Sequence, residues 1–205
     1  MLKIKNVSAK NFMSVGAQTQ AVNFDNVNLT LVLGHNLDMG GDGSRNGTGK
    51  TTIINALSYA LYGEALTNIR RDNLINKTNG KAMIVTVDFE IDGTEYRIER
   101  ARRPNTLKLF IDGVEPGDQE QQGDSRETQK EIEKIIGFPH LMFKHLIALN
   151  TYTEPFLGMK PNDQRDMIEQ LLGITELSEK AEVLKELMKS SRDRIKEEEI
   201  KISAI

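Results

Sequence analysis

Residues 28–62 decide the fold, and they read NLTLVLG, HNLDMGGDGSRNGTG and KTTIINALSYALY in three consecutive parts. The first part is almost continuously apolar, which predicts a strand over 28–33 that is covered on both faces. The middle part is polar and rich in glycine. The third part predicts a helix with one buried face, because its apolar residues recur at helical spacing. A strand, a glycine-rich loop and a helix in this order are the context of a phosphate-binding loop.

Residues 46–52 (Asn-Gly-Thr-Gly-Lys-Thr-Thr) carry the chemistry that such a loop needs. Glycines let successive backbone N–H groups turn toward phosphate oxygens, and the start of the following helix adds positive potential. We expect Lys50 to reach the β- and γ-phosphates of a nucleotide, and the Thr51 hydroxyl to ligate Mg²⁺. The predicted nucleotide site comprises Asn46, Gly47, Thr48, Gly49, Lys50, Thr51 and Thr52.

The loop departs from the general pattern G-x-x-x-x-G-K-[ST] at one position. Ser44 stands where the pattern has glycine, and Gly43 comes just before it. The stretch 35–43 therefore looks like an insertion at the exit of the strand. The alternative is a glycine-rich loop that contains Gly-Lys-Thr by chance, and the predicted strand and helix on its two sides count against it.

Strands are also predicted on both sides of this region, where apolar and polar residues alternate. The last three segments predict an antiparallel meander, because the Asp-Gly pairs at 92–93 and 112–113 are strong hairpin signals. The predicted strands are 2–7, 19–24, 82–91, 94–101 and 106–111.

Asp88 follows the apolar run 84–87 and resembles the carboxylate that binds a metal at the end of a strand in many ATPases. The alternation, however, continues from Phe89 straight into the Asp92-Gly93 turn. An ordinary meander strand is therefore the favoured interpretation of this segment.

The C-terminal third is predicted to be helical. Short helices are expected near 126–136 and 139–145, and Pro161 can begin a helix that continues to Leu172, before Gly173. After residue 175, positions at steps of four and three form a heptad seam, which predicts a left-handed coiled coil; an ordinary amphipathic helix is the alternative. Because the seam is unfinished at residue 205, we expect the chain to continue in a longer protein. The seam consists of Leu177, Ala181, Leu184, Met188, Ser191, Ile195, Glu198, Ile202 and Ile205.

Composition excludes several classes of protein. The 205 residues include 27 Lys and Arg against 30 Asp and Glu, so bulk attraction to nucleic acid is not expected and any DNA contact needs a local patch. The absence of cysteine excludes disulfides and thiolate metal sites within the chain. No apolar run approaches the roughly 20 residues that span a bilayer. The histidines are scattered, which favours surface or packing roles for His35, His140 and His145.

Two groups of arginines are candidates for contacts with DNA phosphates. We expect Arg100 and Arg102 to share one face of a strand, with Ile98 and Ala101 on the other face. A solvated strand face is an equally supported alternative. The candidate DNA-binding residues on the hairpin are Arg100, Arg102 and Arg103, in a cluster with Arg97 and Lys108; the second group is Arg70 and Arg71.

The motifs together resemble a known family. Asn11-Phe12-Met13-Ser14, the loop 46–52 and the stretch 56–63 (ALSYALYG) are similar to the N-terminal half of SMC-like ATPases. Within that group the chain resembles SbcC-type ATPase subunits of double-strand-break repair nucleases, and its glycine-rich insertion resembles the T-even phage branch. Further elements of the resemblance are Pro155-Phe156-Leu157, Lys160-Pro161, Arg165, Leu171-Leu172-Gly173 and the heptads.

The resemblance implies an α/β fold, namely the N-terminal half of an ABC/SMC-type P-loop ATPase head with an antiparallel meander (1–174), followed by the start of a coiled coil (175–205). It implies ATP and Mg²⁺ as cofactors. Its expected partners are the C-terminal half of the same head, a second copy of the chain, an Mre-type metal-dependent nuclease subunit and double-stranded DNA. No membrane is implied, and the expected location is the cytoplasm, that of a host cell if a phage encodes the chain.

The resemblance also implies roles for two further positions. Relatives often carry a basic residue that contacts the nucleotide where this chain has Met13, which cannot make that charged contact. Relatives carry a glutamine that contacts Mg²⁺ and the attacking water at the position of Asn150, so Asn150 joins Lys50 as a catalytic and metal-contacting candidate; a plain polar loop residue is the alternative. The catalytic base and the zinc hook are expected outside these residues.

Two other functions stay open at this point. One is a chromosome-structuring or DNA-tethering SMC ATPase without a nuclease partner. The other is a simple P-loop kinase or GTPase, which leaves the heptads unexplained.

Overall fold

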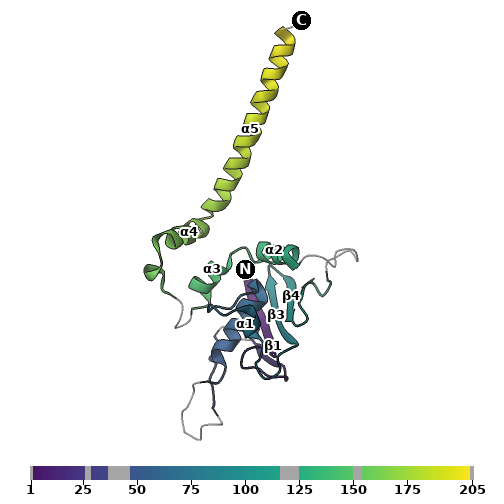
Figure 1. Ribbon diagram of the computed structural model, residues 1–205, viewed down its shortest axis with the longest axis vertical. Coiled ribbons are helices and arrows are strands. Elements are labelled where there is room, and N and C mark those ends of the chain that lie inside the picture. Colours follow the sequence, from purple (N-terminus) through teal and green to yellow (C-terminus); the bar gives the residue numbers. More distant parts are fainter. Residues whose placement is uncertain (1, 26–28, 37–46, 116–124, 150–153, 204–205) are drawn as a thin grey trace. The chain divides into compact units, whose positions relative to one another are not determined.

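A computed structural model describes residues 2–25, 29–36, 47–115, 125–149 and 154–203 (Figure 1). The chain forms two compact units, Met1–Thr153 and Glu154–Ile205. The predicted division into 1–174 and 175–205 stays a prediction.

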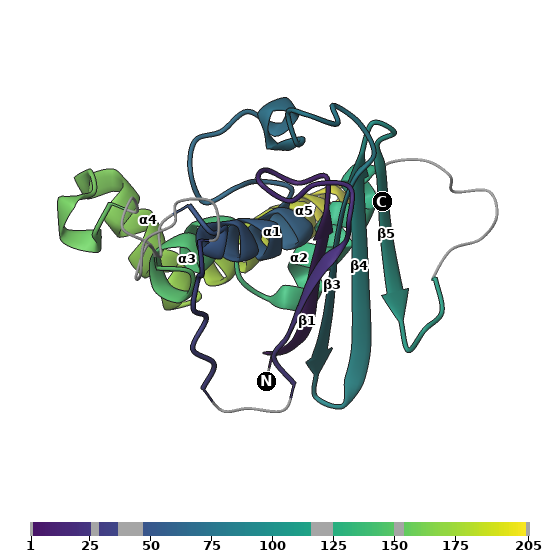
Figure 2. The same ribbon diagram turned by 90° about the horizontal axis from the view of Figure 1, so that it is seen from below.

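The first unit is built on a five-stranded antiparallel sheet with the order β2-β1-β3-β4-β5 (Figure 2). The predicted meander is confirmed, and the turn between β3 and β4 has positive φ at both Asp92 (50°) and Gly93 (89°), as a two-residue hairpin requires. β1 lies between β2 and β3, so the N-terminal strand is paired on both of its edges. The strands are β1 (Leu2–Lys10), β2 (Gln20–Asn23), β3 (Met83–Ile91), β4 (Thr94–Arg102) and β5 (Thr106–Ile111).

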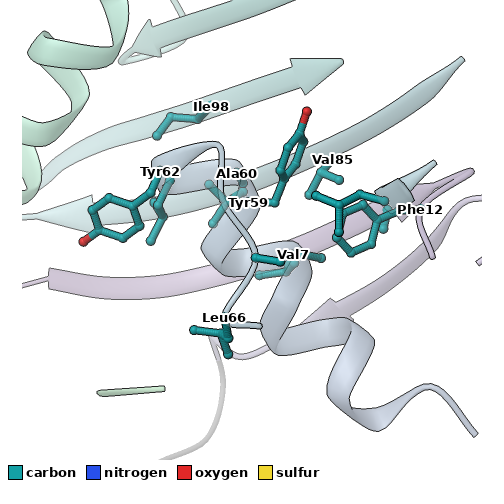
Figure 3. Close-up of a cluster of buried hydrophobic side chains, with 14 of the residues drawn as sticks. Val7, Phe12, Tyr59, Ala60, Tyr62, Leu66, Val85 and Ile98 are labelled. Carbon is teal, nitrogen blue, oxygen red and sulfur yellow. The ribbon is translucent and has the colours of Figure 1, made fainter. Parts of the chain in front are cut away.

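Helices α1 (Lys50–Tyr62) and α2 (Ser125–Ile136) cover the same face of this sheet (Figure 2). The helix with one buried face that was predicted over 50–62 is confirmed. The core between α1 and the strands is continuous (Figure 3). Each large apolar side chain buried there stabilises the fold by about 1.5–3 kcal/mol. Fully buried members include Phe12, Ala60, Leu61, Val85, Val87 and Ile98.

Three short helical elements are also described in the first unit. The 3-10 helix η1 (Arg71–Leu74) follows α1, and α3 (His140–Met142) leads directly into the π-helix η2 (Phe143–Ile147). The Ala148 N–H donates to the Phe143 carbonyl at 2.8 Å and closes the π-helix. The predicted helices near 126–136 and 139–145 are therefore confirmed, although the second one is wider than an α-helix.

The predicted buried strand over 28–33 is wrong for the residues that the structure describes. Residues 29–36 form no strand, and the side chains of Leu29 and Leu31 are 89% and 79% exposed. A strand that is covered on both faces depends on flanking strands and on packing layers. Among the described residues, no strand pairs with this segment. The sheet contains only β2, β1, β3, β4 and β5.

The second unit is helical. It contains η3 (Phe156–Gly158), α4 (Pro161–Leu171) and α5 (Ile174–Ser203), and Gly173 between the last two has φ 65°. Pro161 is at the first position of α4, as predicted. The seam positions Leu177, Leu184 and Ile195 lie on α5 and are each more than half exposed. The helix is thus confirmed, and its pairing in a coiled coil stays a prediction.

Among the described residues, no helix combines the length and the apolar character needed to cross a membrane.

Candidate functional site

The described end of the loop before α1, residues 47–49, has a backbone that favours glycine. Gly47 and Gly49 have φ of 75° and 82°, a conformation that disfavours any side chain. Gly49 is the N-cap of α1, and no side chain caps the helix start. The first N–H groups of α1 are therefore not occupied by a capping side chain, and they fit an anionic phosphate.

The lysine and threonine side chains at the start of α1 are described, and their predicted contacts with phosphate and Mg²⁺ stay predictions. Lys50 Nζ donates to Thr48 Oγ1 at 3.3 Å, and the Thr51 side chain is exposed. The chain also passes very close to the loop at Gly34, where an added Cβ would lie 1.8 Å from Thr48 Oγ1 and 3.0 Å from Lys50 Nζ. Only glycine fits at residue 34 without moving the loop.

The Asn-Phe-Met-Ser motif (residues 11–14) contacts both the start of α1 and the segment 79–82. Ser14 Oγ lies 3.0 Å from Thr52 Oγ1, and Thr52 is buried. Asn11 is also buried; its amide donates to the carbonyls of Lys81 and Ala82 at 3.0 and 3.1 Å, and its oxygen accepts from Asn79 at 2.7 Å. The motif therefore fixes the phosphate-binding loop and the segment 79–82 to the same strand end.

A small apolar recess of about 40 Å³ lies between the strands and the start of α1. Gly49 and Thr52 belong to its wall, so it adjoins the phosphate-binding loop. Its apolar lining comes from Val7, Ala9, Val15, Val22, Ile53 and Ala56.

Two predicted site residues, Asn46 and Asn150, lie outside the described residues, and their roles stay predictions. Gly47, Thr48, Gly49, Lys50, Thr51 and Thr52 are described and form one continuous turn into α1. Asp88 accepts hydrogen bonds from Arg97 and Asn6 within the sheet, which confirms its interpretation as a residue of an ordinary meander strand.

The orientation predicted for Arg100 is wrong. Residues 98, 100 and 102 alternate in phase and therefore point to the same face of β4, the face that packs on the helices. The Arg100 guanidinium lies 5.7 Å from the centre of the Tyr59 ring and donates to the Ala60 carbonyl at 3.2 Å and to Gln129. Burial lowers its pKa to about 10. Arg100 thus supports the end of α1 and is withdrawn from the candidate DNA surface.

The other candidate arginines lie closer to solvent, and two of them meet at one acid. Arg102 Nε donates to Asp72 at 2.9 Å, and Arg103 lies 4.0 Å from the same carboxylate. Arg71 lies 3.4 Å from Glu64. Arg70 and Arg71 are exposed, and the side chain of Arg103 is 59% exposed. Because Asp72 belongs to η1, directly after Arg70 and Arg71, the structure brings the two predicted groups of arginines together, without Arg100.

A polar cluster that the sequence did not reveal joins α1 to α3. His140 Nε2 lies 2.9 Å from Ser58 Oγ, and the Ser58 hydroxyl donates to the Glu64 carbonyl at 2.7 Å. His140 Nδ1 lies 3.4 Å from the Glu64 carboxylate. Burial lowers the pKa of His140, with smaller effects in the same direction from Lys144 and His145, whereas Glu64 acts against it. A surface or packing role was predicted for this histidine, and its contact with Ser58 becomes visible only in the fold.

Comparisons with known proteins assign this arrangement to a family. The family model described as an AAA domain matches residues 6–205.

The chain belongs to the AAA domain family.

This AAA domain is similar to nuclease subunits and to a DNA repair ATPase. It is 32% identical over 188 residues to exonuclease subunit 2 of Enterobacteria phage T4, which is 91% of this chain and 31% of that protein. It is 26% identical over 195 residues to the DNA double-strand break repair Rad50 ATPase of Methanococcus maripaludis (94% and 18%). It is 28% identical over 137 residues to the SbcC component of nuclease SbcCD of Deinococcus radiodurans (62% and 15%). The predicted resemblance to SbcC-type ATPases and their T-even phage branch is confirmed, although the AAA domain spans less than a third of each of these relatives.

A solved structure is similar in fold. It comes from work on ATP-driven dimerization and DNA-stimulated activation of SMC ATPases, with a TM-score of 0.54 at 19% identity. The match covers 82% of this chain and 99% of the other. The predicted SMC-type ATPase fold is therefore confirmed.

Replacing Arg100 tests its assignment to the core of the AAA domain. We expect Arg100→Ala to lower the free energy of unfolding by about 2–3 kcal/mol, because the Ala60 carbonyl and Gln129 lose a buried donor. Arg103→Ala, the control at an exposed residue directly after β4, leaves it close to the wild-type value. Urea unfolding of both variants measures this, and equal stability of the two would contradict the assignment.

Acidification tests the environment of His140. Between its lowered pKa in the folded chain and its ordinary value near 6.5, the unfolded chain binds more protons, so stability falls as pH falls. We expect the free energy of unfolding to decrease from pH 7.5 to pH 5.5 more steeply in the wild-type chain than in His140→Gln, which does not titrate. Identical pH dependence of both proteins would show that the pKa of His140 is not lowered.

Proposed function

We propose that this chain is the nucleotide-binding part of an ATPase subunit that acts with a nuclease on DNA double-strand breaks. The observation that carries the proposal is the glycine loop before α1, with Lys50 beside it, in a chain whose relatives are named as repair ATPases and nuclease subunits. These names also favour a nuclease partner over a chromosome-structuring ATPase without one.

The residues of the loop fit ATP and Mg²⁺. Lys50 would bind the β- and γ-phosphates, and the exposed Thr51 hydroxyl, together with Asn150, would hold the ion. Bound Mg²⁺ supplies positive charge that stabilises the transferred phosphoryl group. Thr52 is in contact with Ser14 through its side chain, and its backbone N–H donates to the Gly49 carbonyl at 3.0 Å. Its part in the nucleotide site would therefore be to hold the loop in place.

Completion of the head requires partners. The exposed segment 29–33 has the composition of a buried strand, which supports pairing with the C-terminal half of the same head. A second copy of the chain would close over the nucleotide, as in the dimerization named for the SMC ATPases of similar fold. The exposed seam of α5 would pair with a returning helix and bind the nuclease subunit, an Mre-type enzyme. The complex would work in the cytoplasm, that of a host cell if a phage encodes it.

Double-stranded DNA would bind at the cluster formed by Arg70, Arg71, Arg102 and Arg103. Asp72 neutralises part of this cluster, so the net attraction is local and moderate. This agrees with the overall charge of −3, which gives no general affinity for DNA.

The Lys50→Ala variant tests the nucleotide site. In the complete protein with its partner subunit, we expect the rate of ATP hydrolysis to fall by about 100-fold or more. The variant lacks the positive charge that Lys50 would place beside the transferred phosphate. Lys130→Ala, at an exposed lysine on α2, serves as the control. Normal ATP turnover in Lys50→Ala would refute the proposed site.

The salt dependence of DNA binding tests the arginine cluster. Each phosphate contact contributes about 0.9 to the slope of log affinity against log salt. The triple variant Arg70→Ala, Arg71→Ala, Arg103→Ala should therefore reduce that slope by about 2 to 3. A variant with Arg97→Ala and Lys108→Ala, whose side chains pair with Asp88 and Glu115, should leave the slope unchanged. An unchanged slope in the triple variant would place the DNA surface elsewhere.

A further inference from the structure

The segment 29–36 approaches the proposed nucleotide site at a single glycine. Residues 29–33 are exposed, whereas Gly34 is half-buried. A Cβ added at this glycine would lie 1.8 Å from Thr48 Oγ1, 2.7 Å from Thr48 Cβ and 3.0 Å from Lys50 Nζ. The backbone of the segment therefore lies directly against two residues of the site.

The need for glycine at residue 34 is one of space. Gly47 and Gly49 have positive φ, and no atom lies within 4 Å of a Cβ added at Gly47. Gly34 does not have positive φ, and its added Cβ would overlap with Thr48. The Thr48 Cβ is bonded directly to the backbone, so it cannot move aside as the end of a long side chain can. Any side chain at residue 34 must therefore displace the backbone of the loop.

The same contact supports the lysine of the site. Lys50 Nζ donates to Thr48 Oγ1 at 3.3 Å, and this hydroxyl is the atom nearest to a Cβ added at Gly34. A shift of Thr48 would therefore move the hydrogen-bond partner of the ammonium that we expect on the β- and γ-phosphates. The backbone N–H groups of the loop, which bind phosphate through their direction, would shift with it.

The contact also bears on the departure of this chain from the general phosphate-binding pattern. That pattern begins with a glycine at the position where this chain has Ser44. Gly34 comes earlier in the sequence, before the predicted insertion, and it is the residue that lies against Thr48 and Lys50. A glycine is thus present at a close approach to the loop, although the spacing in the sequence does not indicate it.

From these contacts we infer that Gly34 is a positioning residue of the nucleotide site, which completes the phosphate-binding loop by leaving room for Thr48 and Lys50. It takes the part of the first glycine of the general pattern, although the insertion separates it from residues 47–52. This inference rests on the proposed function. It adds to the site a residue that the motif alone does not include.

Three substitutions separate this role from a general effect on the fold. Gly34→Ala adds a Cβ against Thr48. Gly16→Ala is the matched control, because Gly16 does not have positive φ and no atom lies within 4 Å of its added Cβ. Thr48→Gly removes the side chain that the new Cβ would meet, so Gly34→Ala can be measured both in the wild-type and in the Thr48→Gly background.

The experiment measures the Kd for ATP in the complete protein with its partner subunit. We expect Gly34→Ala to raise the Kd by about 10-fold or more and Gly16→Ala to change it by less than about 2-fold, because only the first displaces the loop. In the Thr48→Gly background, Gly34→Ala should change the Kd by less than about 3-fold, because the overlap is gone.

Urea unfolding of the chain is the second measurement. The midpoint should be the same in Gly34→Ala and Gly16→Ala, because residues 29–33 are exposed and belong to no strand. A lower midpoint of Gly34→Ala together with a wild-type Kd would leave a purely structural role and overturn the inference.

A wild-type Kd in Gly34→Ala would overturn the inference. An equal loss of affinity in both backgrounds would overturn it as well, since the effect would then not pass through Thr48. Should Thr48→Gly itself not bind ATP, Gly34→Val replaces that background: it should bind ATP more weakly than Gly34→Ala, and equal Kd values would overturn the inference.

Lys50→Ala, measured in parallel, separates the inference from the proposed function. If Lys50→Ala abolishes ATP turnover while Gly34→Ala binds ATP normally, only the inference fails. If Lys50→Ala hydrolyses ATP as fast as the wild type, the proposed nucleotide site fails.

Discussion

The packing of helix α1 on the inner face of the sheet is the constraint on which the rest of the structure depends. Ala56 and Ala60 are small enough to let the helix approach the strands closely, and Tyr59 packs against Phe12 at a ring distance of 5.7 Å. Lys50 and Thr51 begin this helix, so their positions follow from contacts made one to three turns further along it. A phosphate-binding loop has few contacts of its own, and the buried helix supplies its rigidity.

Both ends of α1 are fixed by groups from distant parts of the sequence. At its start, Ser14 contacts Thr52. At its end, Gly63 has φ 71° and donates its N–H to the Tyr59 carbonyl, while Arg100 and Gln129 donate to the carbonyls of Ala60 and Leu61. An added Cβ at Gly63 would lie 3.0 Å from the Arg100 guanidinium, so glycine at the helix end and arginine on β4 fit each other. The end of α1 is thereby stabilised by charge where its dipole is negative.

Much of this could be predicted from the sequence, because local patterns decide it. Alternation and the Asp-Gly turns predicted the meander, and glycines before an amphipathic stretch predicted the loop and α1. The predictions that were wrong concern residues whose environment is set by neighbours far away in the sequence. The apolar run 29–33 looks buried but has no partner strand among the described residues. Arg100 was predicted to lie on a strand face opposite Ile98. Residues two positions apart in a strand share a face, so this spacing already indicated that Arg100 lies on the inner face with Ile98. The contact of His140 with Ser58 joins residues 82 apart, and no spacing in the sequence indicates it.

Amide hydrogen exchange along α1, with and without Mg²⁺ and ATP, tests the central role of this helix most directly. We predict that amides from Ile54 to Tyr62 are strongly protected in both conditions, because they open only when the first unit unfolds. Amides of residues 47–51 should become protected only when nucleotide is bound. If the amides of α1 exchanged without nucleotide as rapidly as those of the exposed helix α5, the helix would not be the rigid support of the site, and its central role would be contradicted.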